Sequence, residues 1–379
     1  KGTRIASCEG ESTCPKVTAI IKVGYDASIT SDPEEKTKDI SITLDIGQYV
    51  SSNPTPDGEL LPELKLPTLP EKILNDNSVQ SDSSIDFSKT SEEDGTKGLY
   101  YTNTNTEDNK TTYYFRGAVE NNYVYFANYY WRIIRINEDG SIRLIYQGKQ
   151  PESFGEDSLI STSIFNSNDD DNAYVGYMYG TPSSSTYSAT HSNTNDSAIK
   201  VVLDQWYEAN LINYQEFLED SGFCGDRSIE DSELGYGNNV TYYGFYNRIE
   251  ALQPQFACPQ ENDLYTTSNS SKGNQALDYP IGLITADEVM YAGGGVGQNI
   301  SYYLYNMSVY WTITPASYSA WIDIPGANIL TLNIVVTDFG MIFTANPPES
   351  FGIRPVINLK SSVLVSSGDG TQNNPYIIS

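Results

Sequence analysis

The chain has 379 residues and a formal net charge of -27, with 49 acidic residues against 22 Lys and Arg residues. This charge repels nucleic-acid phosphates and anionic lipid head groups, so we expect neither as a partner. No run approaches the roughly 20 apolar residues that span a bilayer, and we expect no membrane contact in the mature form. The chain begins with Lys1 rather than Met, which suggests a removed export signal or anchor, or an engineered start.

Residues 1–50 predict an extended N-terminal β arm. Cys8 and Cys14 flank a short polar loop and predict one disulfide. Two runs of alternating apolar residues follow, and each predicts a strand with one apolar face. Two strands alone cannot bury such a face in water, so they must pair with the body, with each other over a third element, or with another molecule. The alternating residues are Val17, Ala19, Ile21 and Val23 in the first run, and Ile40, Ile42, Leu44 and Ile46 in the second.

Residues 51–98 predict a connector. Its first part, 51–70, is spaced by prolines, which favours extended or polyproline conformation. Residues 75–98 are polar and acidic, and this composition predicts disorder in isolation.

Residues 99–379 predict an α+β globular body, mainly of antiparallel strands with two helices. Alternation and turn residues predict strands at 113–115, 123–126, 129–136, 142–146, 309–314, 329–336, 341–344, 356–359 and 376–378. Helical spacing of apolar residues predicts a helix over 197–211. A second helix is predicted over 285–292, because Thr285 and Glu288 form a capping box and glycines follow at 293–295.

Cys224 and Cys258 predict a second disulfide. Their spacing fits no zinc motif, and the chain has a single histidine. Closing this loop is worth ~3–4 kcal/mol in the chain-entropy model. Four free thiols are the alternative, whereas two disulfides predict a secreted or cell-surface protein. Asn-x-Ser/Thr sequons fit export weakly, since a chain rich in these residues contains them by chance; they are Asn109, Asn195, Asn239, Asn269, Asn299 and Asn306.

The acidic run at 166–172 is the candidate metal site. Asn168, Asp170 and Asn172 match the alternating oxygen ligands of a calcium loop. The glycine and the twelfth-position Glu of such loops are missing, so a solvated acidic turn is the alternative. Trp321 lies in a turn-like context and is the candidate for contact with a glycan.

The sequence indicates no catalytic group. His191, the single histidine, lies in a polar segment, which predicts a solvated loop residue, with a general base as the alternative. The glycines at 293–295 follow a helix instead of a strand, so they predict a helix cap and not a phosphate loop. We therefore expect a protein that is not an enzyme and has no certain cofactor.

A series of segments resembles a family of exported surface proteins of Firmicutes, often with a prepilin-like N-terminus. The segments include YYFRGAVENNYVYFANYYWRIIRINEDGSIRLIY, SAIKVVLDQWYEANL, YPIGLITADEVMYAGG and GIRPVINLKSSVLVSSGDGTQNNPYIIS. ADEVMYAGG and the later Gly-x-Arg-Pro also resemble the formylglycine-generating/sulfatase-modifying-factor group. The resemblance covers about residues 70–379 and implies a C-type-lectin-like fold, in which the N- and C-terminal strands of the body pair. Cys224 and Cys258 lie outside the region where that group places its catalytic cysteine pair, so its copper chemistry does not carry over.

Two functions agree with these features. The first is a structural subunit of an extracellular filament, pilus or surface assembly, in which residues 16–50 donate strands to a neighbouring copy. The second is a monomeric surface adhesin that binds glycan or protein through the lectin-like body, with Trp321 near an acidic calcium site. Fold analogy alone does not decide between them.

Overall fold

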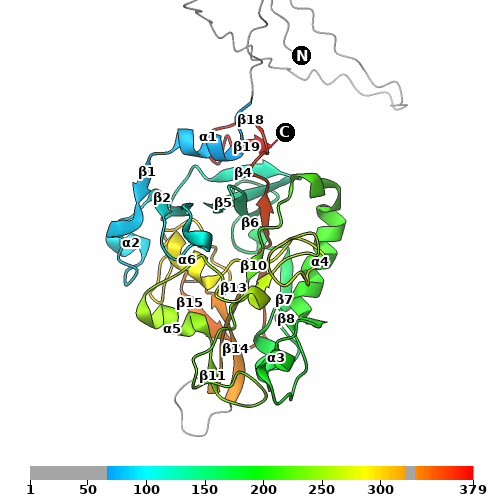
Figure 1. The fold of residues 1–379 in the computed structure, drawn as a ribbon. Helices are drawn as coiled ribbons and strands as arrows, with labels where there is room; N and C mark the ends of the chain where they lie inside the picture. Colours follow the sequence, from blue (N-terminus) through cyan, green and yellow to red (C-terminus); the bar gives the residue numbers. More distant parts are fainter. Residues whose placement is uncertain (1–65, 321–328, 379) are drawn as a thin grey trace, which may run out of the picture. The chain divides into compact units, whose positions relative to one another are not determined.

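Two β-sheets organise the part of the chain that the computed structural model describes, residues 66–320 and 329–378. The larger sheet lies in the upper half of Figure 1 and follows the order β1-β2-β3-β5-β4-β19-β18, while β6 pairs with β5 and β17 pairs with β6. Its pairs are antiparallel except β1–β2 and β4–β19. Its strands are β1 (Val79–Ser81), β2 (Gly98–Thr102), β3 (Thr112–Arg116), β4 (Tyr123–Phe126), β5 (Tyr129–Ile136), β6 (Ile142–Gly148), β17 (Val356–Leu359), β18 (Val365–Ser367) and β19 (Tyr376–Ile378).

The smaller sheet lies in the lower half of Figure 1 and has the order β15-β14-β13-β16-β7, with β11 also paired to β13. Two further pairs, β8–β9 and β10–β12, stand apart from both sheets. The smaller sheet contains β7 (Ser161–Ile164), β11 (Thr241–Tyr242), β13 (Tyr310–Ala320), β14 (Ile329–Val336), β15 (Ile342–Ala345) and β16 (Ser350–Ile353). The separate pairs are β8 (Met178–Tyr179) with β9 (Asn195–Asp196), and β10 (Phe223–Cys224) with β12 (Leu264–Tyr265).

Helices pack around and between the sheets, which confirms the predicted α+β class with mostly antiparallel strands. The α-helices are α1 (Leu69–Asp76), α2 (Ser91–Asp94), α3 (Tyr187–Thr190), α4 (Ala198–Asn210), α5 (Gly244–Ala251) and α6 (Ala286–Ala292). Only α4 and α6 of these were predicted from the sequence. Short 3-10 turns are η1 (Asp82–Ser84), η2 (Glu107–Asn109), η3 (Gly155–Ser158), η4 (Asn172–Val175), η5 (Ile212–Phe217) and η6 (Glu261–Asp263). No helix within the described ranges is long and apolar enough to cross a membrane.

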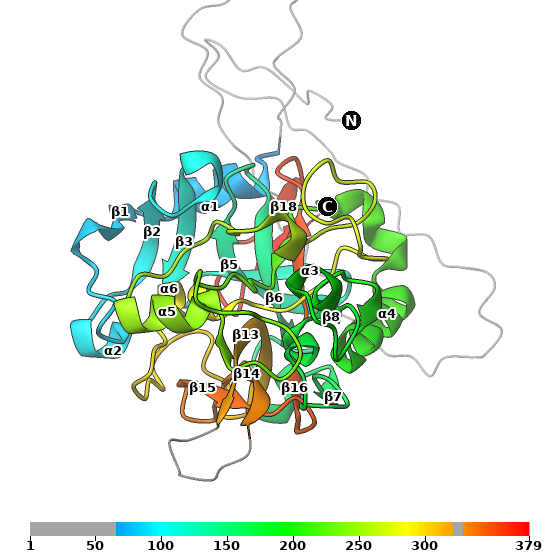
Figure 2. The ribbon, with the colours of Figure 1, turned by 60° about the horizontal axis from the view of Figure 1, so that its bottom comes forward.

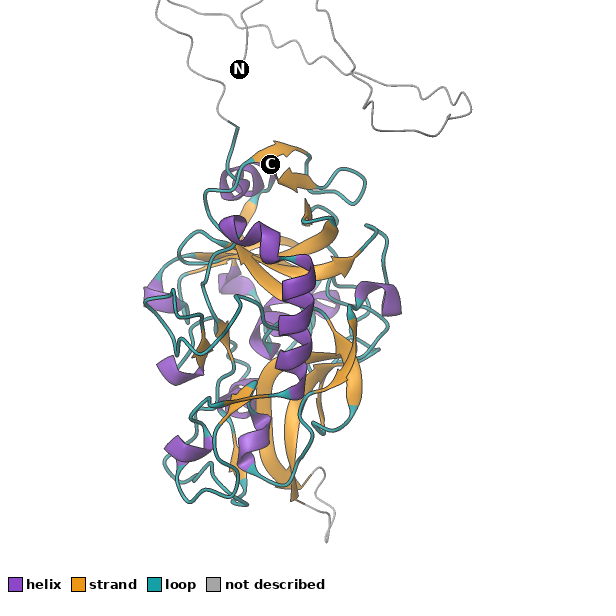
Figure 3. Ribbon diagram, turned by 90° about the vertical axis from the view of Figure 1, so that its right-hand side faces the viewer, coloured by secondary structure: helices purple, strands orange, loops and turns teal. Residues whose placement is uncertain are grey.

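Helix α4 runs alongside both sheets (Figure 3). It begins where the Ser197 side chain accepts a hydrogen bond from the backbone N–H of Lys200. Near its start, the backbone N–H of Ile199 donates to the carbonyl of Phe165, directly after β7 of the smaller sheet. Near its end, Trp206 packs against aromatic rings of β5 and β6 in the larger sheet. The helix therefore ties the two sheets together.

Helix α6 is buried between the sheets (Figure 2). The predicted capping box of Thr285 and Glu288 is present, and Gly293 ends the helix at φ +110°, a conformation that favours glycine. Its last residue, Ala292, accepts a hydrogen bond from Gly117 after β3, and its first, Ala286, donates to Thr314 of β13.

The compact unit spans Leu66–Ser379, so the body begins earlier than the predicted boundary at residue 99. The reason is α1, which a capping box at Thr68 starts and whose Leu69 and Ile73 are fully buried. Residues 79–81 and 98–102 then extend the larger sheet as β1 and β2. Only two buried apolar side chains lie in this polar segment, so its composition did not indicate that it belongs to the body.

The two ends of the body lie side by side. The resemblance implies that the N- and C-terminal strands pair, but β1 pairs with β2, and β19 pairs with β4 and β18. Thr68 forms an antiparallel bridge with Leu364, and β19 pairs with β4. The lectin-like assignment itself stays a prediction. The first disulfide, the alternating strands of the arm at 16–50 and Trp321 lie outside the described residues.

Candidate functional site

A cleft of about 630 Å³ opens beside the larger sheet, where β5 and β6 face α5, α6 and the loops that follow β10 and β12. Its lining is strongly polar, with nine acidic residues and five basic ones. The acidic residues are Glu107, Glu138, Asp139, Glu219, Asp220, Asp226, Asp278, Asp287 and Glu288, and the basic ones are Arg135, Arg143, Arg248, Lys272 and Lys360.

A buried carboxylate holds two arginines at the base of this cleft. Arg135 of β5 and Arg143 of β6 lie opposite each other in the antiparallel register, where like charges repel. Glu288 of α6 lies between them, with its Oε1 3.1 Å from Nε of Arg135 and 2.6 Å from Nε of Arg143. Burial opposes ionisation of Glu288, but the two guanidinium groups outweigh it and lower its pKa. The three side chains therefore form a fixed, charged floor.

A second ion-pair group joins α5 to α6. Nη2 of Arg248 lies 2.9 Å from Oδ2 of Asp287, and the same guanidinium pairs with Asp226 after β10. Asp287 also accepts a hydrogen bond from the backbone N–H of Gln255. All three charged side chains are at most 14% exposed, so the group is held rigidly by its partners.

Other groups on the wall have unused hydrogen-bonding capacity. Asp220 accepts two hydrogen bonds from Thr267 at Oδ2, while its Oδ1 has no partner among residues 66–320 and 329–378. Burial raises the pKa of Asp220. The hydroxyl of Tyr207 and Oδ1 of Asn137 are also buried without a partner in the same part of the chain. A buried polar atom without a partner is costly, so such atoms are candidates for contact with a ligand.

The predicted disulfide between Cys224 and Cys258 is confirmed, and Cys224 lines the cleft. It joins β10 to the segment that follows α5. The backbone N–H of Cys258 also donates to Glu107 at 2.6 Å, which ties this segment to η2. A disulfide is compatible with an extracellular protein.

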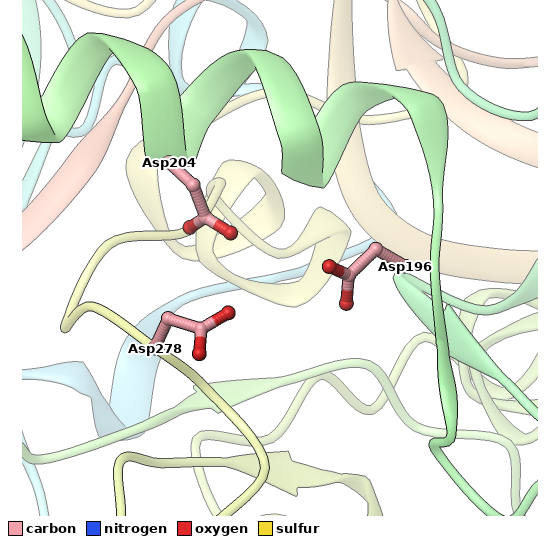
Figure 4. Close-up of side chains that lie close together, drawn as sticks. All are labelled: Asp196, Asp204 and Asp278. Atoms are coloured by element: carbon pink, nitrogen blue, oxygen red, sulfur yellow. The ribbon is translucent and has the colours of Figure 1, made fainter.

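Three carboxylates beside the cleft form a second acidic group, shown in Figure 4: Asp196, Asp204 and Asp278. Such a cluster has the donor type that a metal ion takes. Nζ of Lys200, however, lies 2.7 Å from Asp204 and 3.2 Å from each of the other two. Burial raises the pKa of Asp204 to about 6 although Lys200 opposes this. The ammonium group therefore already supplies the cation that would neutralise this cluster.

Among the predicted calcium ligands, Asn172 already forms hydrogen bonds within the fold. Its Oδ1 accepts a hydrogen bond from the Tyr243 hydroxyl at 2.7 Å, and its Nδ2 donates to the carbonyls of Gly237 and Asn239. Asn168 donates to Tyr174, and Asp170 is exposed. Asn172 is fully buried and its Oδ1 already accepts a hydrogen bond, so calcium at Asn168, Asp170 and Asn172 stays a prediction with a structural obstacle.

The prediction of a solvated loop histidine is wrong. His191 is 1% exposed and lies between the rings of Tyr187 and Tyr243. Its Nε2 lies 2.8 Å from the Gly235 carbonyl, which requires the Nε2–H tautomer, and burial holds its pKa well below the usual range. Tyr187 lies one helical turn before His191, but Tyr243 comes from a distant segment, so the local sequence did not reveal that the imidazole is enclosed.

The sequence did not single out the charged residues of the cleft. A signal was present, since Arg135 and Arg143 interrupt otherwise apolar strand segments. Charged residues in such positions are expected to have partners. Glu288 was recognised, but only as a helix cap.

No protein-family model, curated protein or solved structure matches the chain.

Proposed function

We propose that the body is a non-catalytic binding module of a cell-surface protein, and that it binds a glycan in the cleft. The observation that supports this most is the lining of the cleft, where fixed ion pairs alternate with polar groups whose hydrogen-bonding capacity is unused. Binding sites for small ligands are concave and carry a few fixed polar groups that orient the ligand.

Sugars present many hydroxyl groups and also apolar faces, and the half-buried ring of Tyr279 is the aromatic surface that the cleft offers to such a face. Tyr207 and Tyr279 on its wall are stacked, with ring centroids 4.7 Å apart. Phe256 is stacked against Tyr291 and both are buried, so this pair supports the cleft lining from behind. Rigid aromatic rings give contact area at low entropic cost.

Binding fits this lining better than catalysis does. The most deeply buried carboxylates, Glu288 and Asp287, are each held by arginine side chains. A general acid or base needs a carboxylate that can exchange its proton with substrate. The arginine side chains therefore occupy both carboxylates and leave neither free for this exchange.

The test is a glycan array followed by calorimetry, with and without calcium. Ser271 is exposed and lines the cleft, so Ser271→Trp should fill the cleft without disturbing the core. Ser84→Trp places the same ring on an exposed turn away from the cleft. We expect at least a tenfold loss of affinity in the first variant and none in the second. Equal binding by both variants would refute the proposal.

A second candidate function is a structural subunit of an extracellular filament, built through the arm at 16–50. One feature of the body favours contact with a second copy. Val296, Ile300, Phe339 and Phe343 are each more than half exposed. Their segments adjoin, because Gly295 bridges to Met341 and the Asn299 N–H donates to the Phe339 carbonyl. Exposed apolar patches on soluble proteins commonly mark interaction sites.

Electron microscopy and sizing of the full chain and of a chain lacking residues 1–65 test this second candidate. This truncation keeps α1, which belongs to the body. Fibres from the full chain and monomers from the truncated chain are the expected result. Monomers from both would exclude a filament, and Phe339→Ser separates a role of the patch from a role of the arm.

A further inference from the structure

We infer that the cleft selects a glycan that carries free amino groups, over neutral or acidic glycans of the same length. This inference rests on the proposed function and specifies its ligand. Three features carry it: the charge balance of the lining, the type of hydrogen-bonding group left unused, and the engagement of the arginines.

The charge balance favours a cationic ligand. The lining has nine acidic residues and five basic ones. The basic residues outside the ion-pair groups are Lys272 and Lys360, and the latter donates to the Glu216 carbonyl. Acidic residues outside those groups include Glu219 and Asp220, so the surplus charge of the cleft is negative. Clefts lined by one sign of charge concentrate ligands of the opposite sign.

The arginines cannot readily serve an acidic ligand. Arg135 and Arg143 share Glu288, and Arg248 holds Asp226 and Asp287. An acidic sugar would have to displace one of these carboxylates, which would leave a buried charge without a partner.

The unused groups are mainly acceptors. Oδ1 of Asp220 and Oδ1 of Asn137 can only accept hydrogen bonds, and the Tyr207 hydroxyl can accept as well as donate. Asn137 and Tyr207 are at least nine-tenths buried. An ammonium group brings three donors and no acceptor, so it matches this set and also neutralises Asp220.

Calorimetry with three tetrasaccharides tests the inference: β-1,4-linked glucosamine, its N-acetylated form and galacturonic acid. We expect the glucosamine tetramer to bind about tenfold more tightly than the N-acetylated one, and galacturonic acid not to bind. The preference should largely vanish in 1 M NaCl, where the Debye length is about 3 Å.

Two substitutions test whether Asp220 causes the preference for the glucosamine tetramer. Asp220→Asn should weaken glucosamine binding about fivefold and leave N-acetylated binding unchanged. Asp231→Asn removes the same charge from an exposed residue outside the lining and should change neither. Equal or tighter binding of the N-acetylated tetramer overturns the inference and leaves the proposed function standing. Failure of all three tetramers to bind also overturns the inference, and the glycan array with Ser271→Trp then decides the proposed function separately.

Discussion

Glu288→Gln is the substitution that most directly tests the role of the buried charges. Glutamine keeps the shape of the side chain and can still accept the capping hydrogen bond from Thr285. It removes the negative charge that both Arg135 and Arg143 share, and these arginines lie opposite each other in the sheet. The substitution therefore changes the ion pairs while it leaves the cap in place.

The expected loss follows from the burial of all three groups. Removing one partner from a buried ion pair typically costs ~3–5 kcal/mol, because the remaining charge is left without compensation. For a unit of this size, that corresponds to a decrease in Tm of about 5–8 °C. The lowered pKa of Glu288 gives the pH dependence its sign: the stabilisation is present above the unfolded pKa and is lost as pH falls through the folded pKa.

Urea unfolding of both proteins from pH 2 to pH 7 measures this effect. The difference between wild type and Glu288→Gln should be largest at pH 7 and should shrink in acid. Glu93→Gln is the matched control, since Glu93 occupies the same capping position in α2 but is exposed and has no arginine partner in the cleft. A loss under about 1 kcal/mol at pH 7, or a loss equal to that of the control, would show that the ion pairs contribute little net stability.

Three further predictions concern other parts of the body. Cys224→Ser with Cys258→Ser should lower the free energy of unfolding by about 4 kcal/mol, from the sequence separation of 34 residues, and urea unfolding with and without reductant measures this. Burial raises the pKa of Asp204 to about 6, so protonated Asp204 stabilises the fold below about pH 4, and this contribution is lost as pH rises through 6. The free energy of unfolding of wild type, relative to that of Asp204→Asn, should therefore fall between pH 4 and pH 6. A difference that does not change with pH would contradict the raised pKa. In a glycosylating host, mass spectrometry should find no glycan at Asn299 or Asn306, because both are buried, whereas modification there would mean that their loops open.

Local patterns predicted much of the fold. The helix at 198–210 and the strands at 123–126, 129–136, 329–336, 356–359 and 376–378 lie where alternation and helical spacing place them. The capping box of Thr285 located α6 because its signal is confined to four residues. In contrast, α1 was not predicted although Thr68 and Glu71 form the same capping box, because the surrounding prolines and polar residues indicated an extended connector.

The candidate site was harder to predict because it depends on contacts between distant segments. Arg248 and Asp287 come from different helices, and Arg143 and Glu288 from a strand and a helix. The local sequence around either residue of such a pair does not indicate which residue is its partner. The sequence around His191 is mostly polar, whereas in the structure its imidazole is buried. The prediction from its local sequence therefore failed.

The antiparallel contact between the two ends of the body also determines how the protein would respond to mechanical load. Tension applied to the chain before Leu66 reaches first the hydrogen bonds from Leu69 to Val363 and from Val365 to Pro67. Behind them, the buried side chains of α1 resist extraction. A pulling force would therefore act on this contact before it reached the cleft, so the cleft lining would keep its arrangement until these hydrogen bonds had broken.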